Sequence, residues 1–160
     1  MKENLTLEKR LDAFAKLGAW IRDGEAGMED LILGSENYNG WFTPANSRKA
    51  LWNIGEMLQP SALNSWSKQW EDLITDQEPK KIGLILAGNI PLVGFHDVLA
   101  VLVAGHQALI KLSSQDPKLL PYTLSKLIEL EPGFGNRINY VERLENFDAV
   151  IATGSNNSAR

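Results

Sequence analysis

Cysteine is absent from this chain of 160 residues, and histidine occurs only twice. The absence of cysteine excludes disulfide bridges and cysteine metal sites, and it removes the commonest nucleophile of thioester chemistry. With two histidines and no thiolate, a zinc site would lack most of its usual ligands, so we predict no bound metal.

Long apolar runs and clusters of basic residues are missing as well. No stretch approaches the roughly 18 to 20 continuous apolar residues that span a bilayer, and the opening MKENLTLEKRLD lacks the apolar core of a signal peptide. The net charge is -4 and no Lys/Arg run occurs, which argues against nucleic acid or an anionic membrane as a partner. We therefore predict a cytoplasmic protein without membrane insertion.

The composition is sufficient for a folded domain. Hydrophobic residues make up 44% of the chain, which is long enough to bury one substantial core. A polar stretch around Pro79, LITDQEPKK, separates two regions of different periodicity. We predict a helical segment over residues 1–78 and part of a nucleotide-binding α/β domain over residues 79–160.

The apolar residues of the first region recur at helical spacing. The stripe from Leu7 to Ile21 predicts a helix over residues 7–22 with Thr6 as its N-cap. Thr43-Pro44 is typical of an N-cap and a first helical residue, and it predicts a second helix. The expected buried face of that helix is Leu51, Ile54 and Leu58. A third helix is predicted from residues that we expect to pack in the core, namely Leu63, Trp66 and Trp70.

Strand and helix patterns alternate after Pro79. Short apolar runs predict strands over residues 82–86, 108–112, 138–141 and 149–152. A helix over residues 95–104 is expected to end at Gly105, and Asp116-Pro117 is interpreted as the N-cap and first residue of another helix. Because both faces of the strands are apolar, we predict an α/β fold. Its sheet is doubly wound, Rossmann-like and mostly parallel, with helices on both faces and a helical arm before it.

Small and polar residues follow the predicted strands at the ends where such sheets bind ligands. These segments are residues 87–91, 111–114 and 152–156. A glycine or asparagine after a strand is also ordinary turn chemistry. The coincidence of all these segments at one edge of the sheet is what indicates a site.

The ordinary dinucleotide fingerprint is absent. The one Gly-x-Gly, Gly133-Phe134-Gly135, follows a helix rather than a strand and lacks the third glycine. We interpret it as a loop between a helix and a strand. A dinucleotide must therefore be held in another way.

Motifs spread along the chain resemble the acyl-CoA reductase family of the aldehyde dehydrogenase superfamily, which includes the fatty-acyl reductase of bacterial bioluminescence. They are NGWFT at 39–43, GNIPL at 88–92, LIKLSSQDP at 109–117 and FDAVIATGS at 147–155. The resemblance implies an aldehyde dehydrogenase-type cofactor domain. It also implies reduction of a fatty acyl thioester to an aldehyde through a catalytic cysteine, with NADP(H) as the cofactor and NAD(H) not excluded.

The resemblance implies a catalytic role for one residue of this chain. Asn89 matches the asparagine whose side-chain amide donates to the oxyanion of the thiohemiacetal-like intermediate, and a donor so placed is worth roughly 3 to 4 kcal/mol. Pro91 would then fix the turn beyond it and keep the backbone of Asn89 extended.

The remaining matches imply cofactor contacts. Lys111 matches the lysine that binds the adenosine ribose, and Ser113 and Ser114 follow it at the strand end. Ser114 falls where NAD-preferring relatives commonly carry glutamate, and a neutral side chain there tolerates the 2′-phosphate of NADP. Gly154 and Ser155 match a Gly-Ser pair that contacts the pyrophosphate, where free backbone N–H groups favour an anion.

The chain departs from the family because it has no cysteine to act as nucleophile. We therefore expect it to be the N-terminal part of the reductase, inactive by itself, with the fatty acyl thioester as substrate of the full-length enzyme. The alternative is a non-catalytic nucleotide-binding or protein-interaction module with the same fold. An open sheet edge adds the hypothesis that the chain forms a homodimer.

The histidines have ordinary structural explanations. His96 lies at the start of a predicted helix, where contact with substrate or phosphate stays open as the alternative. His106 follows the end of that helix, where a protonated imidazole would suit the helix dipole.

Overall fold

The N-terminal helices begin close to the residues that their sequence signals predict. In the computed structural model, which describes residues 5–74 and 78–154, α1 runs over Leu7–Asp23. Its N-cap is Thr6, whose Oγ1 accepts a hydrogen bond from the backbone N–H of Lys9 at 3.3 Å. Helix α3 (Pro44–Met57) begins in the same way after Thr43. Its expected face is buried, which confirms the prediction for Leu51, Ile54 and Leu58.

The other elements of this region are shorter. Helix α2 spans Ala26–Gly34, the 3-10 helix η1 spans Ser35–Asn37, and α4 spans Pro60–Lys68. The third predicted helix is therefore present, but it stops before Trp70, which lies in a turn with 47% of its surface exposed. The expectation that Trp70 packs in the core is wrong, because helical spacing no longer applies once the helix has ended.

The second region forms a parallel sheet. Its strands are β1 (Lys81–Ile85), β2 (Gln107–Lys111), β3 (Ile138–Tyr140) and β4 (Ala149–Ala152). Their order in the sheet is β3-β2-β1-β4, and every pairing is parallel. This is the order of the first strands in a doubly wound, Rossmann-like sheet, which confirms the predicted fold class.

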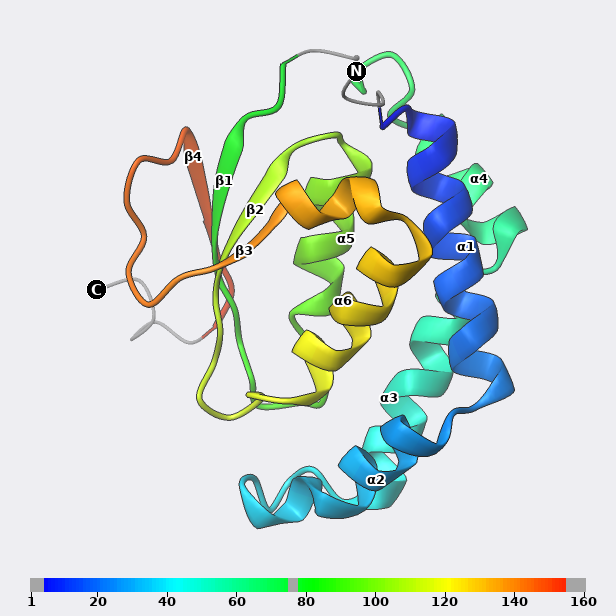
Figure 1. Cartoon of the computed structure of the whole chain (residues 1–160), viewed down its shortest axis with the longest axis vertical. Helices are drawn as coiled ribbons and strands as arrows, with labels where there is room; N and C mark the ends of the chain where they lie inside the picture. Colours follow the sequence, from blue (N-terminus) through cyan, green and yellow to red (C-terminus); the bar gives the residue numbers. More distant parts are fainter. Residues whose placement is uncertain (1–4, 75–77, 155–160) are drawn as a thin grey trace.

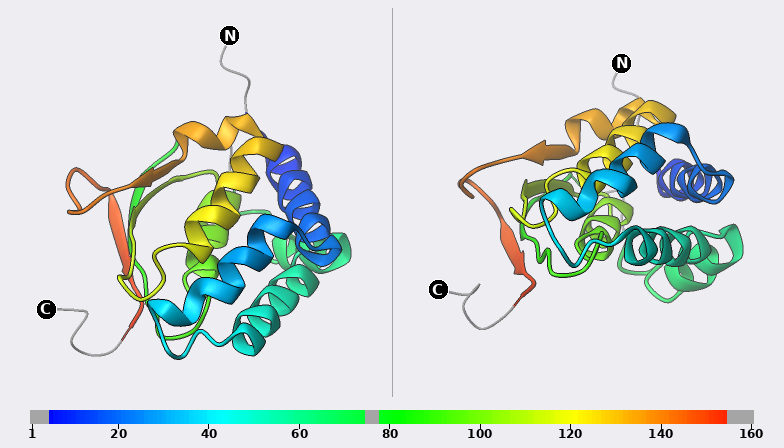
Figure 2. Two further views of the ribbon diagram at one scale, coloured as in Figure 1. Left: turned by 60° about the horizontal axis from the view of Figure 1, so that its bottom comes forward. Right: turned by 90° about the horizontal axis from the view of Figure 1, so that it is seen from below.

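Helices cover one face of this sheet. They are α5 (Phe95–Val103), between β1 and β2, and α6 (Leu119–Leu130), between β2 and β3. The N-terminal helices pack outside them as a further layer (Figures 1 and 2). No helix lies on the other face among residues 5–74 and 78–154, so the prediction of helices on both faces is not met there. Leu144, between β3 and β4, contacts Gly83 on that face, where a Cβ would lie 3.0 Å from its Cδ1.

One cluster of buried apolar side chains joins the helical segment to the sheet region. Phe14 of α1 is fully buried, and its ring packs edge-on against Phe95 of α5 and Phe134. Arg10, one turn earlier on α1, donates from Nε to the carbonyl oxygen of Val103 at the end of α5, at 3.0 Å. The division of the chain into residues 1–78 and 79–160 stays a prediction, and the two regions share this core.

Phe134 belongs to the 3-10 helix η2 (Pro132–Asn136), which connects α6 to β3. The Gly133-Phe134-Gly135 stretch is thus a connection between a helix and a strand, as predicted. Its aromatic side chain faces the core rather than a ligand.

Local predictions around α5 and α6 have mixed outcomes. Gly105 follows the end of α5 with a φ of 89°, as expected of a glycine at a helix end. Helix α6 begins only at Leu119, so Asp116-Pro117 is not its N-cap and first residue.

His106 is not a protonated end-cap, since its Nδ1 accepts from the backbone N–H of Lys80 at 3.3 Å. Burial, together with nearby positive charges, lowers its pKa below the ordinary value.

Candidate functional site

The carboxyl ends of β1, β2 and β4 lie side by side, and the predicted site segments begin there. Ile85 at the end of β1 pairs with Lys111 of β2 on one side and with Ala152 of β4 on the other. The backbone N–H of Thr153 donates to the carbonyl oxygen of Ile85 at 3.0 Å. The strand order reverses between β1 and β4, and doubly wound sheets bind ligands in the crevice at such a point.

The end of β4 is also connected to the start of α5. The hydroxyl of Thr153 donates to Oδ2 of Asp97, in the first turn of that helix. This hydrogen bond keeps the start of α5 next to the reversal point of the sheet.

The loop after β1 and the loop after β2 are in contact at Gly88. A Cβ at position 88 would lie 2.5 Å from the Cβ of Ser113 and 3.1 Å from the Cβ of Gln115. Because Gly88 is buried and has no side chain, the two loops can approach this closely. The structure thus gives Ser113 a packing contact with the loop that carries Asn89.

Replacing Gly88 by alanine should force these loops apart. Overpacking of this kind lowers the free energy of unfolding by about 1–3 kcal/mol, which denaturant unfolding measures. Gly34→Ala is the matched control, because a Cβ at position 34 would meet nothing within 4 Å. Adding Ser113→Gly to Gly88→Ala should recover most of the loss. Equal stability of the Gly88→Ala and Gly34→Ala proteins would contradict the close contact.

Asn39 joins the same two loops from the N-terminal side. Its Nδ2 donates to the carbonyl oxygens of Gly88 at 3.4 Å and Gln115 at 3.2 Å, and its Oδ1 accepts from the N–H of Trp41 at 3.0 Å. The segment between α2 and α3 therefore reaches the carboxyl edge of the sheet, in the lower part of Figure 1. Sequence reasoning missed this role, although NGWFT was noted, because bonds across 49 and 76 residues leave no local signal.

Asn89 lies on a groove of about 330 Å³ between the loop after β1 and helix α3. Its side chain is exposed and makes no hydrogen bond with the other described residues. Trp41, which is 75% exposed, and Ile90, which is 54% exposed, give the groove apolar surface, and Lys49 gives it an ammonium. The groove therefore combines available N–H donors with apolar contact area.

Pro91 and Leu92 shape the turn that follows Asn89. The N–H of Val93 donates to the carbonyl oxygen of Ile90 at 3.2 Å, which closes a turn with Pro91 second and Leu92 third. Leu92 has a φ of 60°, as the third residue of a type II turn requires, although glycine normally occupies that place. A left-handed conformation costs a leucine about 1–2 kcal/mol. Leu92 is fully buried, so its surroundings hold it there.

The residues predicted to bind a cofactor lie in several places along this edge. Lys111 is exposed and lines a pocket of about 430 Å³ at the carboxyl ends of β2 and β3. Ser114 is exposed in the loop after β2, and Gly154 is exposed after β4. Ser155 lies outside the described residues. The structure thus places Asn89 and Lys111 in different pockets of the same edge.

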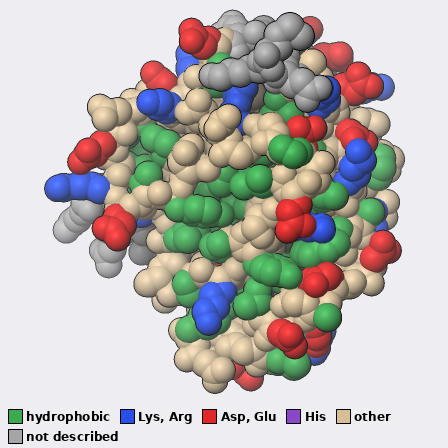
Figure 3. Space-filling view, in the orientation of Figure 1, with side chains coloured by type: hydrophobic (Ala, Val, Ile, Leu, Met, Phe, Trp, Pro, Cys, Tyr) green, Lys and Arg blue, Asp and Glu red, His purple; other side chains and the backbone are tan. Residues whose placement is uncertain are grey.

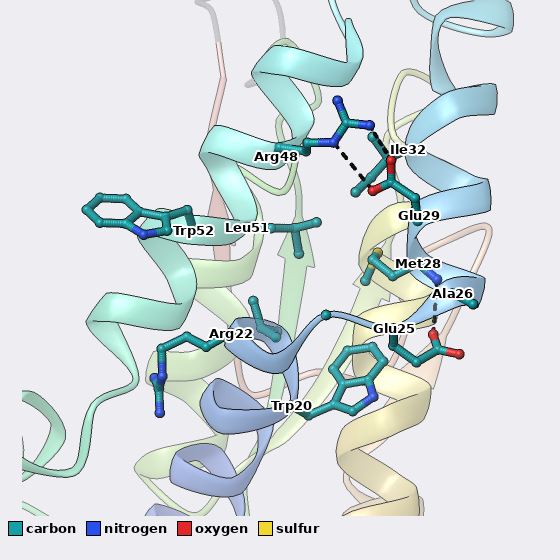
Figure 4. Close-up of a pocket in the computed structure, with 12 residues that line it drawn as sticks. Trp20, Arg22, Glu25, Ala26, Met28, Glu29, Ile32, Arg48, Leu51 and Trp52 are labelled. Carbon is teal, nitrogen blue, oxygen red and sulfur yellow. Dashed lines mark hydrogen bonds and ion pairs between the residues drawn. The ribbon is translucent and has the colours of Figure 1, made fainter.

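Another pocket, of about 420 Å³, is formed by α1, α2 and α3. Figure 4 shows the side chains of Trp20, Met28 and Leu51 around it, with the ion pair of Arg48 and Glu29 at one end. None of the residues that the sequence predicts for the site lines this pocket.

On the face shown in Figure 3, apolar side chains gather in the middle, with acidic and basic side chains mostly around them. Among residues 5–74 and 78–154, no three His, Asp or Glu side chains gather in a way that could hold a metal ion. In the same part of the chain, no helix has the length and apolarity to cross a membrane. The carboxyl edge of the sheet remains the candidate site.

Comparison with known proteins identifies the family of the chain. Neither the comparison with curated proteins nor that with solved structures gives a match. The family model for acyl-CoA reductase (LuxC) matches residues 35–160, from the start of η1 through the sheet. Since this match includes most of the chain and all of the predicted site segments, the chain belongs to the LuxC family of acyl-CoA reductases.

Proposed function

We propose that the chain is the N-terminal, cofactor-binding part of an NADPH-dependent reductase that converts a fatty acyl thioester to an aldehyde. The observation that carries the proposal is the meeting of the loops after β1, β2 and β4 at the reversal point of the sheet. Parallel sheets of this order bind nucleotides at that point. Membership of the acyl-CoA reductase family supports the reaction.

The residues at this edge fit a nicotinamide dinucleotide. The ammonium of Lys111 is exposed and makes no ion pair with the described residues, so it is available to the ribose and a 2′-phosphate. Gly154 offers exposed backbone beside the end of β1 for contact with the pyrophosphate. When bound, the cofactor supplies the two electrons of the reduction. The chain's own part is to hold the cofactor beside the substrate.

Preference for NADPH over NADH is proposed to depend on Ser114. Its side chain is exposed and uncharged, so it does not repel the 2′-phosphate. We expect Ser114→Glu to weaken NADPH binding about tenfold relative to NADH, which corresponds to about 1.4 kcal/mol. Titration of each cofactor into the 160-residue chain, followed by nicotinamide fluorescence, measures both affinities.

The matched control is Ser65→Glu, which adds the same charge at an exposed position of α4. It should leave both affinities unchanged. Absence of NADPH and NADH binding to the unaltered chain would remove the cofactor-binding part of the proposal. Binding that Ser114→Glu does not change would remove the assignment of Ser114.

The acyl thioester is proposed to bind in the groove that contains Asn89. The side-chain amide of Asn89 donates to the thioester oxygen as negative charge develops there, which lowers the barrier because the donor is already in position. Lys49 and Asn53 line the same groove, and neither makes a hydrogen bond or ion pair with the other described residues. Their polar groups suit the amides and phosphates of a thioester carrier.

Trp41 is the largest apolar surface of this groove, and its replacement tests substrate binding. We expect Trp41→Ala to raise the KM for an acyl-CoA about tenfold in the full-length reductase with little change in kcat, because contact with a remote part of the substrate is lost. Trp52→Ala is the matched control, since Trp52 is 63% exposed on α3 but lines the pocket among the N-terminal helices. Equal KM values for both variants would contradict the proposed groove.

A second candidate function is a non-catalytic nucleotide-binding or protein-interaction module that keeps this fold without a nucleophile. The intact mass of the native protein, captured from its source cells with an antibody to residues 1–160, separates the two. A species much heavier than 17.8 kDa supports the reductase, and a species at that mass supports the module.

Catalytic inactivity of the chain alone is part of the first proposal. Without a thiol, residues 1–160 should not reduce an acyl thioester, and aldehyde formation by the purified chain would overturn this.

A cytoplasmic location and a homodimer also stay predictions. The dimer is supported by the exposure of Val150 and Ile151 on β4, which is an edge strand among the described residues.

A further inference from the structure

Asp116 is a buried carboxylate in the loop between β2 and α6. It is 3% exposed and makes no ion pair with the described residues. Its Oδ2 accepts a hydrogen bond from the backbone N–H of Leu92 at 2.9 Å, and its Oδ1 has no hydrogen-bond partner among the described residues. Burying a carboxylate without a cationic partner is unfavourable. Stability alone therefore does not explain an aspartate at this position.

The carboxylate lies between the start of α6 and the loop after β1. Burial raises the pKa of Asp116, and the backbone N–H groups of Leu92, Leu120 and Leu119 oppose this rise. The last two belong to the first turn of α6. Asp116 thus joins the helix start to the turn at Leu92.

The hydrogen bond is made at the most constrained point of the turn. Leu92 has the positive φ described above and is 1% exposed, so its N–H would be a buried donor without a partner if Asp116 were absent. Pro91 fixes the preceding residue of the turn. The course of the loop from β1 through Asn89 therefore depends on how Leu92 is held.

We propose that Asp116 is a positioning residue for Asn89, which holds the Asn89–Leu92 loop in its turn through the hydrogen bond to Leu92. This inference rests on the proposed function of Asn89 as an oxyanion donor. Asn39 adds a second connection between the same loops, at Gly88 and Gln115. The two connections lie on either side of Asn89 in the sequence, at Gly88 and at Leu92.

The test compares Asp116→Ala with Asp116→Asn in the 160-residue chain by NMR. Asp116→Ala should raise the hydrogen-exchange rate of the Leu92 amide about tenfold or more, and it should shift the side-chain amide resonances of Asn89. Asp116→Asn retains an acceptor oxygen, so both signals should stay near those of the unaltered protein. This rescue by a residue of the same shape is not expected if Asp116 only carries a charge.

Asp148 provides the matched control. Its Oδ2 also accepts one backbone hydrogen bond, from Lys81 at 2.7 Å, but Asp148 is exposed and lies at the amino end of the sheet. Asp148→Ala should change neither the Leu92 exchange rate nor the Asn89 resonances. Unchanged Leu92 exchange in Asp116→Ala, or an equal response in Asp148→Ala, would overturn the proposal.

A measurement on the unaltered protein covers the case in which Asp116→Ala does not fold. The Leu92 amide proton and the side-chain carboxyl carbon of Asp116 should titrate with one common midpoint, and separate midpoints would overturn the proposal. Tyr38 is a nearby ionisable group, and Lys118 lies over its ring at 5.7 Å. Burial and the charge of Asp116 raise the pKa of Tyr38 to about 12, so Tyr38 does not titrate in the range of the carboxyl group.

These readouts report on the loop and not on catalysis. If the loop responds as expected but replacement of Asn89 leaves the full-length reductase active, the proposed function of Asn89 fails while the hydrogen bond stands. If Asn89 proves essential but the loop does not respond to Asp116→Ala, the positioning role fails alone.

Discussion

Replacement of Asn89 by alanine is expected to lower the kcat of acyl reduction in the full-length reductase about 10² to 10³-fold, or about 2.7–4 kcal/mol. The reason is that a donor aimed at developing negative charge acts in the transition state more than in the ground state. The KM for the acyl thioester should change little, since the ground-state carbonyl gains less from the same donor. Steady-state kinetics with an acyl-CoA and NADPH measure both constants.

Two further variants separate the loss of the donor from other effects. Asn89→Asp keeps the size of the side chain but replaces the amide by an acceptor, so it should be at least as inactive as Asn89→Ala. Asn64→Ala removes an exposed asparagine from α4 and should leave kcat unchanged. Activity of Asn89→Asp near that of the unaltered enzyme would show that the amide is not an oxyanion donor.

Replacement of Phe14 by alanine is expected to cause the largest loss of stability. Its ring is fully buried between Phe95, at 6.2 Å between centroids, and Phe134, at 5.6 Å. Removing such a ring leaves a cavity and costs about 3–5 kcal/mol. For a domain of this size Tm should fall by about 2–4 °C per kcal/mol. Calorimetry or circular dichroism measures the change.

Phe147→Ala is the matched control, because Phe147 is 44% exposed in the connection before β4. Its effect should stay within about 0.5 kcal/mol.

All five tryptophans lie within residues 1–78, so tryptophan fluorescence follows the helical segment, while amide exchange in β1 and β2 follows the sheet. Phe14→Ala should lower the stability reported by both probes together. A loss confined to the fluorescence would mean that the two regions unfold separately.

The elements with local signals were predictable from the sequence. Helix α1 begins after Thr6 and α3 begins after Thr43 because an N-cap is decided by residues within one turn of the chain. The buried strands were recognised from continuous apolar runs, and their bounds differ from the prediction by about one residue. The order of the strands agrees with the predicted fold class, since parallel strands with helical crossovers allow few arrangements.

The errors fall where distant residues decide the local structure. Trp70 has the spacing of a core residue, but the helix ends before it. Asp116 has the sequence context of an N-cap, yet α6 begins only at Leu119, and Oδ2 of Asp116 accepts a hydrogen bond from the N–H of Leu92, a residue 24 positions away. His106 follows a helix end, where a protonated imidazole would suit the dipole, but burial and surrounding cations lower its pKa. For Asp116 and His106, groups distant in the sequence outweigh the local preference, whereas for Trp70 the helical spacing no longer applies once the helix has ended.

The candidate site shows the same division. From the sequence alone, the segments at Asn89, Lys111 and Gly154 could be assigned to one edge, because the carboxyl ends of parallel strands must share an edge. Their arrangement within that edge could not be predicted. The contact between Gly88 and Ser113 became known only when the loops were placed in space.

The sequence by itself therefore determined the starts of α1 and α3, the buried strands, the α/β class and the edge at which the site lies, since each follows from residues close together in the chain. The tertiary structure alone decided which side chains hold that edge together. Asn39 joins Gly88 and Gln115, and Asp116 holds Leu92, through hydrogen bonds between segments far apart in the sequence. Such bonds depend on the packing of the whole core, which brings the segments within reach of one another, and no local pattern encodes them.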